Sequence, residues 1–402
     1  MTGSNMDNNL YQKAILEQQL LRPTNINHAT QDVIRKLSYI QIDSLNIVNR
    51  AHHHTLWNRV DDYGFDDLSA LTLEKKIFEY WFHAASYLPM EDYKFALVKM
   101  NAIKNDPKHY VHKNVEDKDV LYVLDKIKAE GALKDRDFKS NAKDKGTWWN
   151  WKPYKNALEK LFMQGDLMVY KRDGIEKVYD LKSKVLPEDL ATSEATSSEY
   201  AYRLIETALE AHGFATLSQM IHLRGNASLK KEVQKVLDEK VFEGSIEQHS
   251  AEHKNALYCF KNALESVAQT VPDYLKILSP FDNAVIHRDK LKDIFGFDYK
   301  IECYTPKDKR LFGYFCLPIL FNDAFVARVD CKAFRKEGVL EIIHLHLEES
   351  MVDIELFSLL FAKEMARYAS FNNCSEIVLR DVSPKKYFNN IKKGIINVRS
   401  HI

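Results

Sequence analysis

The sequence is poor in cysteine. None of its five cysteines forms a Cys-x-x-Cys pair or stands in metal-ligand spacing with histidines. They are Cys259, Cys303, Cys316, Cys331 and Cys374. We therefore expect reduced, mostly buried thiols and no structural zinc.

Long apolar runs are also missing. No stretch of about 18 uninterrupted apolar residues is present to span a membrane, and the polar residues 1–10 lack the apolar core of a secretory signal. We therefore expect a cytoplasmic chain that does not engage a membrane.

Net charge is absent as well. The 57 basic side chains balance 57 acidic ones, which argues against indiscriminate, high-affinity binding to polyanions. Nucleic acid is not excluded, because a concave basic face can coexist with an acidic back. The sequence has no P-loop, dinucleotide-binding glycine pattern, Gly-x-Ser-x-Gly elbow or His-Glu-x-x-His, which excludes most nucleotide-dependent and hydrolase classes.

Helical periodicity dominates the first part of the chain. Helices are predicted over residues 9–22, where a proline follows, and over residues 31–39. Apolar residues recur at helical spacing over residues 45–57 and again over residues 68–81. This region is therefore predicted to be largely helical.

The order helix, helix, helix, hairpin occurs twice in the middle of the chain. This order is typical of a winged-helix module. In the first unit, helices that end at Gly131 and Gly165 precede short strands at 167–170 and 178–181, although a third helix is not clear. A Ser/Thr/Glu-rich linker around residues 191–198 leads to the second unit.

The second unit has the more complete pattern. A helix from Tyr200 is followed by helices at 217–223 and 229–237, and then by candidate strands at 241–245 and 256–260. We interpret these two units as tandem winged helices.

Strand-like segments follow Pro280. They are separated by turn residues and cover residues 297–304, 313–320, 325–331 and 339–347. An amphipathic helix is predicted over residues 353–368.

The predicted fold class is α+β, with tandem winged-helix modules followed by a C-terminal antiparallel, barrel-like β-rich domain under a covering helix. The predicted domains are a helical or winged-helix region at 1–115, winged helices at 116–190 and 191–270, and the β-rich domain at 271–402.

Gln41 and Asp43 could carry chemistry. In an extended segment they lie on one face, while Ile40 and Ile42 anchor the other. A carboxylate so placed can accept a proton from water or stabilise a developing cation, and the amide can hold the same water. The alternative is that Asp43 and Ser44 only cap a following helix.

Three consecutive histidines, His52 to His54, raise the possibility of a metal site. Successive residues of a helix point about 100° apart, so at most two of them could share an ion. Because no Glu or Cys stands at matching spacing, contact with a DNA phosphate or a packed core position is favoured over zinc.

Two aromatic segments each allow two interpretations. Residues 79–89 fit the buried end of a helix stopped by a proline, from which His83 stands out as a possible cleft group. Trp148, Trp149 and Trp151 could stack on bases, but such residues more often plug a domain junction.

A basic strand connection contains Lys307, Lys309 and Arg310. Such a loop is usually a solvated turn, and it is also what contact with a phosphate backbone requires.

A set of short strings occurs in order between about residue 30 and residue 345. They are Gln41-Ile42-Asp43-Ser44, Arg50-Ala51-His52-His53, Glu79-Tyr80-Trp81 with His83, Ala85-Ser86 before Leu88-Pro89, Trp148-Trp149 and Trp151 before Ala157-Leu158, Leu278-Ser279-Pro280-Phe281-Asp282-Asn283, Phe295-Gly296-Phe297, Lys309-Arg310, Gly313-Tyr314, Leu317-Pro318 and Arg328-Val329-Asp330. Together they resemble the AlkZ/YcaQ-type bacterial DNA glycosylases.

The resemblance implies a concave DNA-binding surface and an enzyme that excises N7-alkylated purines and unhooks interstrand crosslinks. The family's catalytic element is a Gln-x-Gln or Gln-x-Asp pair, so Gln41 and Asp43 are the implied catalytic residues, in the form of the broader-specificity YcaQ branch. The implied partner is double-stranded DNA with alkylated or crosslinked purines, bound by a monomer. The expected DNA-binding residues are Asn46, Arg50, His52, His53, His83, Ser86, Lys307, Lys309, Arg310 and Arg328.

The chain departs from the family pattern at two places. Ala84 stands where a glutamate is usual, and Ile286 and His287 replace a Trp-Asp pair. Both changes alter the polar lining of the cleft, so the role of His83 follows less directly from the resemblance than that of Asp43.

The implied mechanism needs few catalytic groups. N7-alkylation makes guanine a cationic leaving group, so Asp43 would activate water and stabilise the oxocarbenium-like sugar while Gln41 positions the water. No lysine adjoins the pair, so we expect a monofunctional glycosylase without metal or organic cofactor.

Two competing classes fit the sequence less well than the glycosylase. A non-catalytic winged-helix regulator gains nothing from Asp43 beside DNA phosphates, where repulsion costs affinity. A nucleoside-processing enzyme would need a phosphate or ribose motif, which the sequence lacks.

Overall fold

The computed structural model describes most of the chain. The described residues are 3–138, 152–224, 227–249, 255–265, 267–351 and 353–399. Trp148, Trp149 and Trp151, for which base stacking and a junction plug are the alternatives, lie outside the described residues. No helix of the described part is both long and apolar enough to cross a membrane.

The first module follows a helix, α1 (Gly3–Gln18), that is predicted from the sequence over residues 9–22. Its elements are α2 (Thr30–Leu37), β1 (Ile40–Gln41), α3 (Ala51–Trp57), α4 (Asp67–Leu73), β2 (Ile77–Trp81) and β3 (Ala85–Pro89). The three antiparallel strands lie in the order β1-β3-β2.

The helix predicted over residues 68–81 is wrong in its second half. Residues 77–81 form β2 of a hairpin, and the aromatic stretch 79–89 is therefore not the end of a helix. A short apolar run fits a buried strand as well as a buried helix, and aromatic and β-branched residues favour the strand.

The helix predicted over residues 45–57 begins only at Ala51. The preceding backbone is bonded to the C-terminal domain instead. The carbonyl of Ile47 accepts from the N–H of Ala333 at 3.0 Å, and the N–H of Asn49 donates to the side chain of Asn372 at 2.8 Å. These tertiary hydrogen bonds replace those of a helix.

The second module is joined to the first by η1 (Met90–Asp92), α5 (Tyr93–Asn105) and η2 (Tyr110–His112). Its elements are α6 (Asp117–Glu130), β4 (Leu133–Lys134), η3 (Asp135–Phe138), α7 (Lys152–Met163), β5 (Leu167–Asp173) and β6 (Glu176–Leu181), with the strands in the order β4-β6-β5. A short helix, α8 (Lys182–Val185), follows.

The third module contains α9 (Ser197–His212), α10 (Leu217–Met220), α11 (Ala227–Phe242), β7 (Ile246–His249) and β8 (Leu257–Phe260). The strand predicted at 241–245 is wrong, because α11 continues to Phe242 and Gly244 then takes the positive φ that turns the chain into β7.

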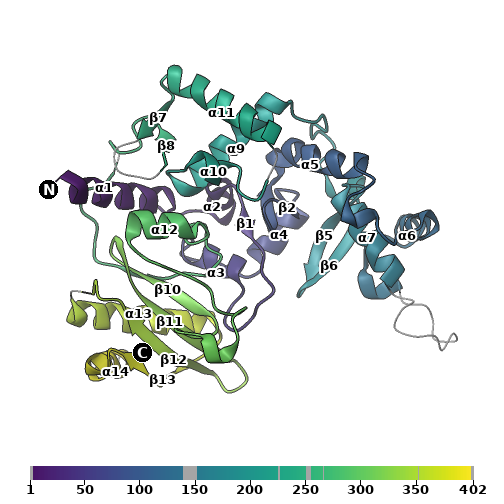
Figure 1. The fold of residues 1–402 in the computed structure, drawn as a ribbon. Helices are drawn as coiled ribbons and strands as arrows, with labels where there is room; N and C mark the ends of the chain where they lie inside the picture. Colours follow the sequence, from purple (N-terminus) through teal and green to yellow (C-terminus); the bar gives the residue numbers. More distant parts are fainter. Residues whose placement is uncertain are drawn as a thin grey trace.

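All three modules share one connectivity. In the first two, a short strand after the first helix pairs with the last strand of the hairpin; in the third, a bridge between Ala215 and Tyr258 takes that place. The two predicted winged helices are thus present, and the first module has the same plan. In Figure 1 the first module occupies the middle, the second the right and the third the top of the molecule.

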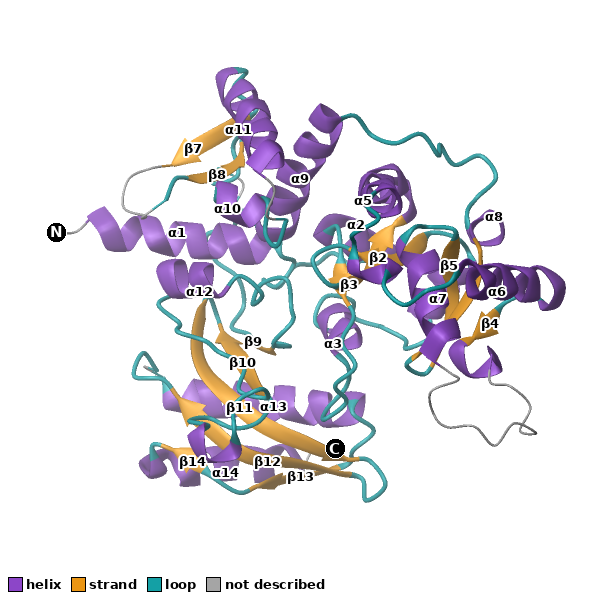
Figure 2. Ribbon diagram, turned by 45° about the vertical axis from the view of Figure 1, so that its right-hand side comes forward, coloured by secondary structure: helices purple, strands orange, loops and turns teal. Residues whose placement is uncertain are grey.

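The C-terminal domain is built on one curved sheet with the strand order β13-β12-β11-β10-β9. Its elements are β9 (Leu275–Ile277), α12 (Arg288–Phe295), η5 (Lys307–Lys309), β10 (Cys316–Phe321), β11 (Ala324–Phe334), β12 (Val339–Leu347), α13 (Ile354–Phe371), β13 (Glu376–Leu379), β14 (Val382–Ser383), η6 (Lys385–Tyr387) and α14 (Phe388–Arg399). Figure 2 shows α13 and α14 against this sheet.

The predictions for this domain need three corrections. The covering helix is confirmed as α13, but a second helix, α14, packs beside it. The sheet is not purely antiparallel, because β13 and β14 run parallel to β12. No strand forms at 297–304, where Phe297 and Tyr299 pack as stacked rings in a hydrophobic cluster.

The domain limits 1–115, 116–190, 191–270 and 271–402 remain a proposal. Each limit falls between regular elements of the structure.

Candidate active site

The segment that carries Gln41 and Asp43 is extended, as predicted. Gln41 pairs with Ser86 of β3, and the N–H of Ile42 donates to the carbonyl of Ala85 at 2.8 Å. Ile40 is fully buried in the core of the first module, and Ile42 packs against the same core. The two isoleucines anchor the segment, so the side chains of Gln41 and Asp43 are available on the other face.

Asp43 is partly buried and does not cap a helix. Its Oδ2 accepts a hydrogen bond from the backbone N–H of Leu45 at 2.8 Å. Burial raises the pKa of the Asp43 carboxyl, although backbone hydrogen bonds from Leu45 and Ser44 oppose this effect. Such a carboxylate is a stronger base than one in water.

A segment of the C-terminal domain faces Asp43. Burial and then the charge of Asp43 raise the pKa of Cys303, and burial, Cys303 and Asp43, in that order, raise the pKa of Tyr304. Tyr304 is 80% exposed, so this segment projects a large aromatic ring from the surface.

His83 fixes the orientation of Gln41. Its Nε2 lies 2.9 Å from Oε1 of Gln41, and because an amide oxygen can only accept, Nε2 carries the hydrogen. Burial lowers the pKa of His83 to about 3, with Arg224 as the next cause, so the ring is neutral at physiological pH. The amide NH₂ of Gln41 is thereby left to donate toward the cleft.

His83 belongs to a group of four histidines around Tyr39. The hydroxyl of Tyr39 lies 3.1 Å from Nε2 of His212, which lies 3.2 Å from Nε2 of His287. Burial holds the pKa values of His212 and His287 well below the ordinary range. The ring of His222 lies between those of His83 and His287, with ring centres 5.9 and 5.1 Å away. His287, which departs from the family pattern, is therefore part of this histidine cluster.

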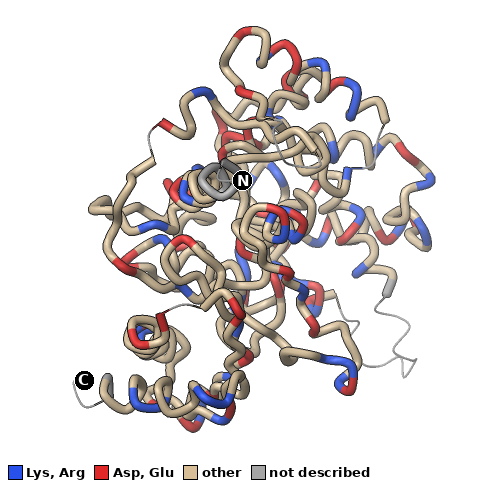
Figure 3. The backbone as a smooth tube through the Cα atoms, turned by 60° about the vertical axis from the view of Figure 1, so that its left-hand side comes forward, with Lys and Arg blue, Asp and Glu red and all other residues tan. Residues whose placement is uncertain are grey.

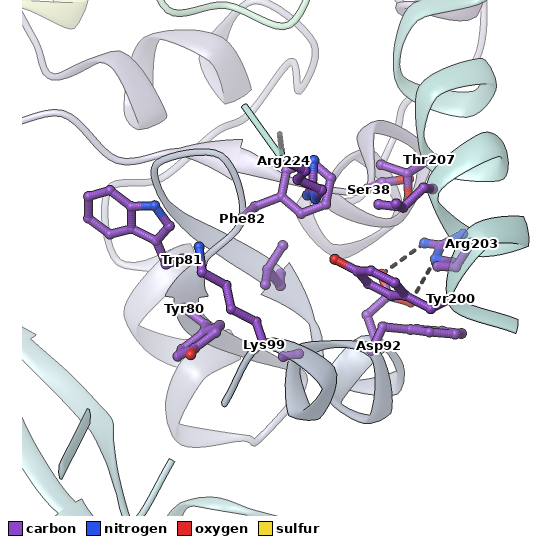
Figure 4. A pocket seen from close by; sticks show the side chains of 14 residues that line it. Ser38, Tyr80, Trp81, Phe82, Asp92, Lys99, Tyr200, Arg203, Thr207 and Arg224 are labelled. Atoms are coloured by element: carbon purple, nitrogen blue, oxygen red, sulfur yellow. Dashed lines mark hydrogen bonds and ion pairs between the residues drawn. The ribbon is translucent and has the colours of Figure 1, made fainter. Parts of the chain in front are cut away.

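A pocket of aromatic and basic side chains adjoins this cluster (Figure 4). The guanidinium of Arg224 lies 4.1 Å from the centre of the Phe82 ring. Burial lowers the pKa of Lys99 in the same pocket to about 8. Across the pocket, Arg203 forms an ion pair with Asp92 at 2.8 Å.

Arg50, His52 and His53 lie at the beginning of α3. Nε of Arg50 and Nδ1 of His52 are buried without a hydrogen-bond partner among the described residues, whereas Nδ1 of His53 lies 2.6 Å from the Tyr63 hydroxyl. Burial, followed by neighbouring positive charge, holds the pKa of His52 well below its ordinary value. Because His54 turns the other way and bonds the carbonyl of Ile277 at 2.7 Å, the three histidines do not share a metal site.

The hairpin of the second module reaches this group. Arg172 forms two hydrogen bonds of 2.7 Å with the buried carboxylate of Glu79, and Lys177 lies 3.3 Å from it. The Arg50 guanidinium approaches the carbonyl of Gly174 at 3.5 Å. The second module therefore contributes cationic side chains beside Arg50.

The basic connection predicted to contact DNA is part of a rigid loop, residues 302–313. The carboxylate of Glu302 accepts from the backbone N–H groups of Leu311, Phe312 and Gly313 at 2.8–3.2 Å. Gly313 has a φ of +140°, and a Cβ there would collide with Asp330. The loop exposes Lys307 and Lys309, while Arg310 is partly buried.

Three other expected DNA-binding residues differ in how exposed they are to solvent. Asn46 is exposed three residues after Asp43. Ser86 is fully buried, and its hydroxyl donates to the carbonyl of Ala84. Arg328 is 3% exposed, lies over the rings of Phe297 and Phe312, and pairs with Glu348.

The Phe-Asp-Asn string has a structural explanation that its sequence did not show. Asp282 and Arg59 form a fully buried ion pair with two hydrogen bonds of 2.8 Å. Asn283 donates to the carbonyls of Leu37 and Tyr39 at 3.3 and 3.1 Å. The C-terminal region thus holds the residues that lead into Gln41.

Comparison with known proteins agrees with this arrangement. Residues 34–371 match the family model described as DNA glycosylase AlkZ-like. The structure is similar to that of the Streptomyces sahachiroi DNA glycosylase AlkZ, with a TM-score of 0.62 and 14% sequence identity over 93% of this chain and 99% of that one. At this identity the similarity shows a shared fold.

Proposed function

The chain belongs to the AlkZ-like DNA glycosylase family, and we propose that it hydrolyses the N-glycosidic bond of N7-alkylated purines in double-stranded DNA and unhooks interstrand crosslinks formed at such bases. The observation that carries the proposal is the pair Gln41 and Asp43, held on one face of an anchored strand. Asp43 is a partly buried carboxylate with a raised pKa, and the amide of Gln41 is oriented by His83.

The proposed reaction begins with a base that already carries positive charge. An N7-alkylated guanine leaves with the electron pair of the glycosidic bond and needs no general acid. Asp43 takes a proton from water as the water attacks the sugar carbon, and its charge stabilises the oxocarbenium-like transition state. The products are the free alkylated base and an abasic site.

Gln41 supports this step by holding the water. Because His83 donates to the amide oxygen, the NH₂ group of Gln41 is oriented to donate a hydrogen bond to the water. The water then directs its own hydrogen toward the carboxylate of Asp43. His83, expected from the sequence to touch DNA, is on this proposal a positioning residue.

DNA binding is proposed to rest on local positive charge. Lysine and arginine positions are mixed with aspartate and glutamate positions along the coloured part of the backbone in Figure 3, in keeping with the zero net charge of the sequence. Arg50 at the beginning of α3 and the exposed Lys307 and Lys309 of the 302–313 loop offer phosphate contacts.

The central experiment measures excision from a duplex with one N7-methylguanine. We expect Asp43→Asn to lower single-turnover excision by about 100- to 10,000-fold and to leave DNA binding intact. Asp62→Asn, which changes an exposed carboxylate, is the matched control. Excision by Asp43→Asn at the wild-type rate would refute the assignment of Asp43.

A second experiment tests whether the enzyme is monofunctional. Borohydride reduction during turnover should trap no covalent complex with DNA. Lys99, whose pKa is lowered to about 8, is the lysine of the adjoining pocket that a lyase reaction would use. A trapped complex that disappears in Lys99→Gln would overturn the monofunctional mechanism.

A further inference from the structure

The third module carries three potential metal ligands that take no part in the reaction above. Glu247 and His249 lie on β7 and Cys259 on β8, and their ligand atoms lie within 4.8 Å of one another. Glu247 pairs with Cys259 across the hairpin, and His249 follows two residues later. The three side chains therefore share one face of the hairpin.

The distances from His249 to the other two ligand atoms fit a tetrahedral metal site. Nε2 of His249 lies 3.5 Å from Sγ of Cys259 and 3.6 Å from Oε2 of Glu247. Bonds of about 2.3 Å to sulfur and about 2.0–2.2 Å to nitrogen and oxygen, at tetrahedral angles, place ligand atoms roughly 3.3–3.6 Å apart. A hydrogen bond explains only one of the two contacts, because Nε2 carries at most one hydrogen.

The surroundings hold the His249 ring in a binding orientation. Nδ1 lies 3.2 Å from the hydroxyl of Tyr11 on α1, and the ring packs edge-on against Tyr11 and Phe214, at 5.7 and 5.9 Å. A hydrogen on Nδ1 that points to the Tyr11 oxygen leaves the lone pair of Nε2 for an ion. Metal-bound histidines are usually oriented in this way by a bond from the other ring nitrogen.

The carboxylate is also oriented. Oε1 of Glu247 accepts from the backbone N–H of Asn262 at 3.4 Å, which leaves Oε2 as the oxygen that faces His249. The Glu247 side chain is 40% exposed, so an ion can enter from solvent on this side, while Cys259 is fully buried on the other.

We propose that Glu247, His249 and Cys259 bind a zinc-type divalent ion, with a water molecule as the fourth ligand. A thiolate, an imidazole and a carboxylate together suit a borderline-soft ion. On binding, the Cys259 thiol releases its proton to solvent and a sulfur–metal bond forms, and the two anionic ligands balance the charge of the ion. The bound ion stabilises the hairpin of the third module against α1.

Sequence spacing alone does not show this site. The ligands fit no short ligand motif, and Cys259 meets His249 only because β8 folds back along β7. Burial raises the pKa of the Cys259 thiol to about 12, so in the metal-free protein this side chain is a protonated thiol.

Cobalt(II) binding to the full-length, untagged, metal-free protein tests the proposal. We expect a near-ultraviolet sulfur-to-cobalt charge-transfer band and tetrahedral d–d bands in the visible, both abolished by added zinc. Cys259→Ser should lose the charge-transfer band, and Cys303→Ser, which removes a thiol outside the cluster, should retain it. A wild-type protein without the band, or a Cys259→Ser protein that keeps it, would overturn the site.

A second variant covers the case in which Cys259→Ser does not fold. Glu247→Gln changes a half-exposed side chain and removes only the carboxylate ligand. We expect its cobalt affinity to fall by at least about tenfold, since even the loss of an indirect partner costs about 10- to 100-fold. Wild-type affinity in Glu247→Gln, with unchanged circular dichroism, would contradict a three-ligand site.

Discussion

At the scale of single residues, Asp43 is subject to two opposing requirements. Its partly buried position strengthens it as a base, but the same position penalises the charged form that catalysis needs. A carboxyl whose pKa is raised on folding costs stability once it is ionised, because the native state binds more protons than the unfolded chain between the two pKa values and stability falls as the pH rises through that range. The proposed catalytic residue should therefore destabilise the fold at neutral pH.

The first prediction follows from the direction in which folding shifts the pKa of Asp43. Asp43→Asn should be more stable than the wild type at pH 7, and the difference should disappear as the pH falls through the raised pKa to below the ordinary aspartate value. Asparagine preserves the bond to Leu45, because its amide oxygen can still accept. Urea unfolding at neutral and acidic pH measures the difference, and a variant less stable at pH 7 would contradict the assigned burial effect.

The second prediction concerns the pH profile of the wild type. Excision should fall as Asp43 is protonated, and the acid limb of kcat/KM should lie above the ordinary pKa of aspartate. His83 cannot produce this limb, because its pKa is about 3. A profile that stays flat down to the ordinary aspartate pKa would be evidence against Asp43 as the base.

The third prediction tests the positioning role of His83. If His83 acts only through Gln41, then His83→Ala should lower kcat in the wild type but have little further effect in a Gln41→Ala background. The expected coupling energy is about 0.5–3 kcal/mol. His83→Gln, which keeps a donor, should recover part of the loss, whereas additive losses would show that His83 acts independently.

The sequence could predict the placement of Gln41 and Asp43 but not their partners. Alternation in an extended segment places Gln41 and Asp43 on one face. The bond from His83 depends on how the β2–β3 hairpin turns, and the support from Asn283 depends on a contact between distant parts of the chain. Neither contact leaves a local pattern.

At the scale of elements, the 302–313 loop is the feature with the clearest consequence. The carboxylate of Glu302 ties its backbone from within, and these bonds lower the pKa of Glu302. Because its shape is set before DNA arrives, little entropy is lost when its lysines meet phosphates. It also exposes two large side chains, Tyr304 and Leu311, which are 80% and 78% exposed.

The fourth prediction concerns the salt dependence of binding through this loop. Lys307→Ala with Lys309→Ala should reduce the slope of log K against log salt by roughly 0.9 for each phosphate that the variant no longer neutralises. Lys392→Ala with Lys393→Ala removes two exposed charges on α14 and should leave the slope unchanged. Equal slopes in all three proteins would exclude the loop from DNA binding.

Elements whose signals are local could be predicted from the sequence, and others could not. The helices of the second and third modules follow from apolar periodicity and from glycines at their ends. Strand β2 resembles a helix in sequence, because its five residues, four of them buried, are too few to separate the two periods. Strands β13 and β14 could not be given a direction, since parallel pairing depends on the path of α13.

At the scale of the whole molecule, the C-terminal region and the first module form one unit around Arg59 and Asp282. Both side chains are fully buried, and Arg59 also donates to the carbonyls of Gln19 and Thr55. Removing one partner of such a pair leaves an uncompensated buried charge.

The fifth prediction is a stability loss from breaking this pair. Asp282→Asn should lower the free energy of unfolding by about 3–5 kcal/mol. Glu91→Gln, which breaks the exposed Arg35–Glu91 pair, should cost at most about 1 kcal/mol. Equilibrium urea denaturation measures the free energy of unfolding of both variants. Equal losses would show that burial does not make the Arg59–Asp282 pair more important for stability than the exposed pair.

The hydrogen bonds of Asn283 have a consequence for the order of events during synthesis. The carbonyls of Tyr39 and Leu37 find this partner 244 and 246 residues later in the chain. A ribosome therefore completes all three modules before the segment that leads into Gln41 can form these hydrogen bonds. Nascent chains that end before Asn283 should form the helices of the three modules but should not excise a base from DNA.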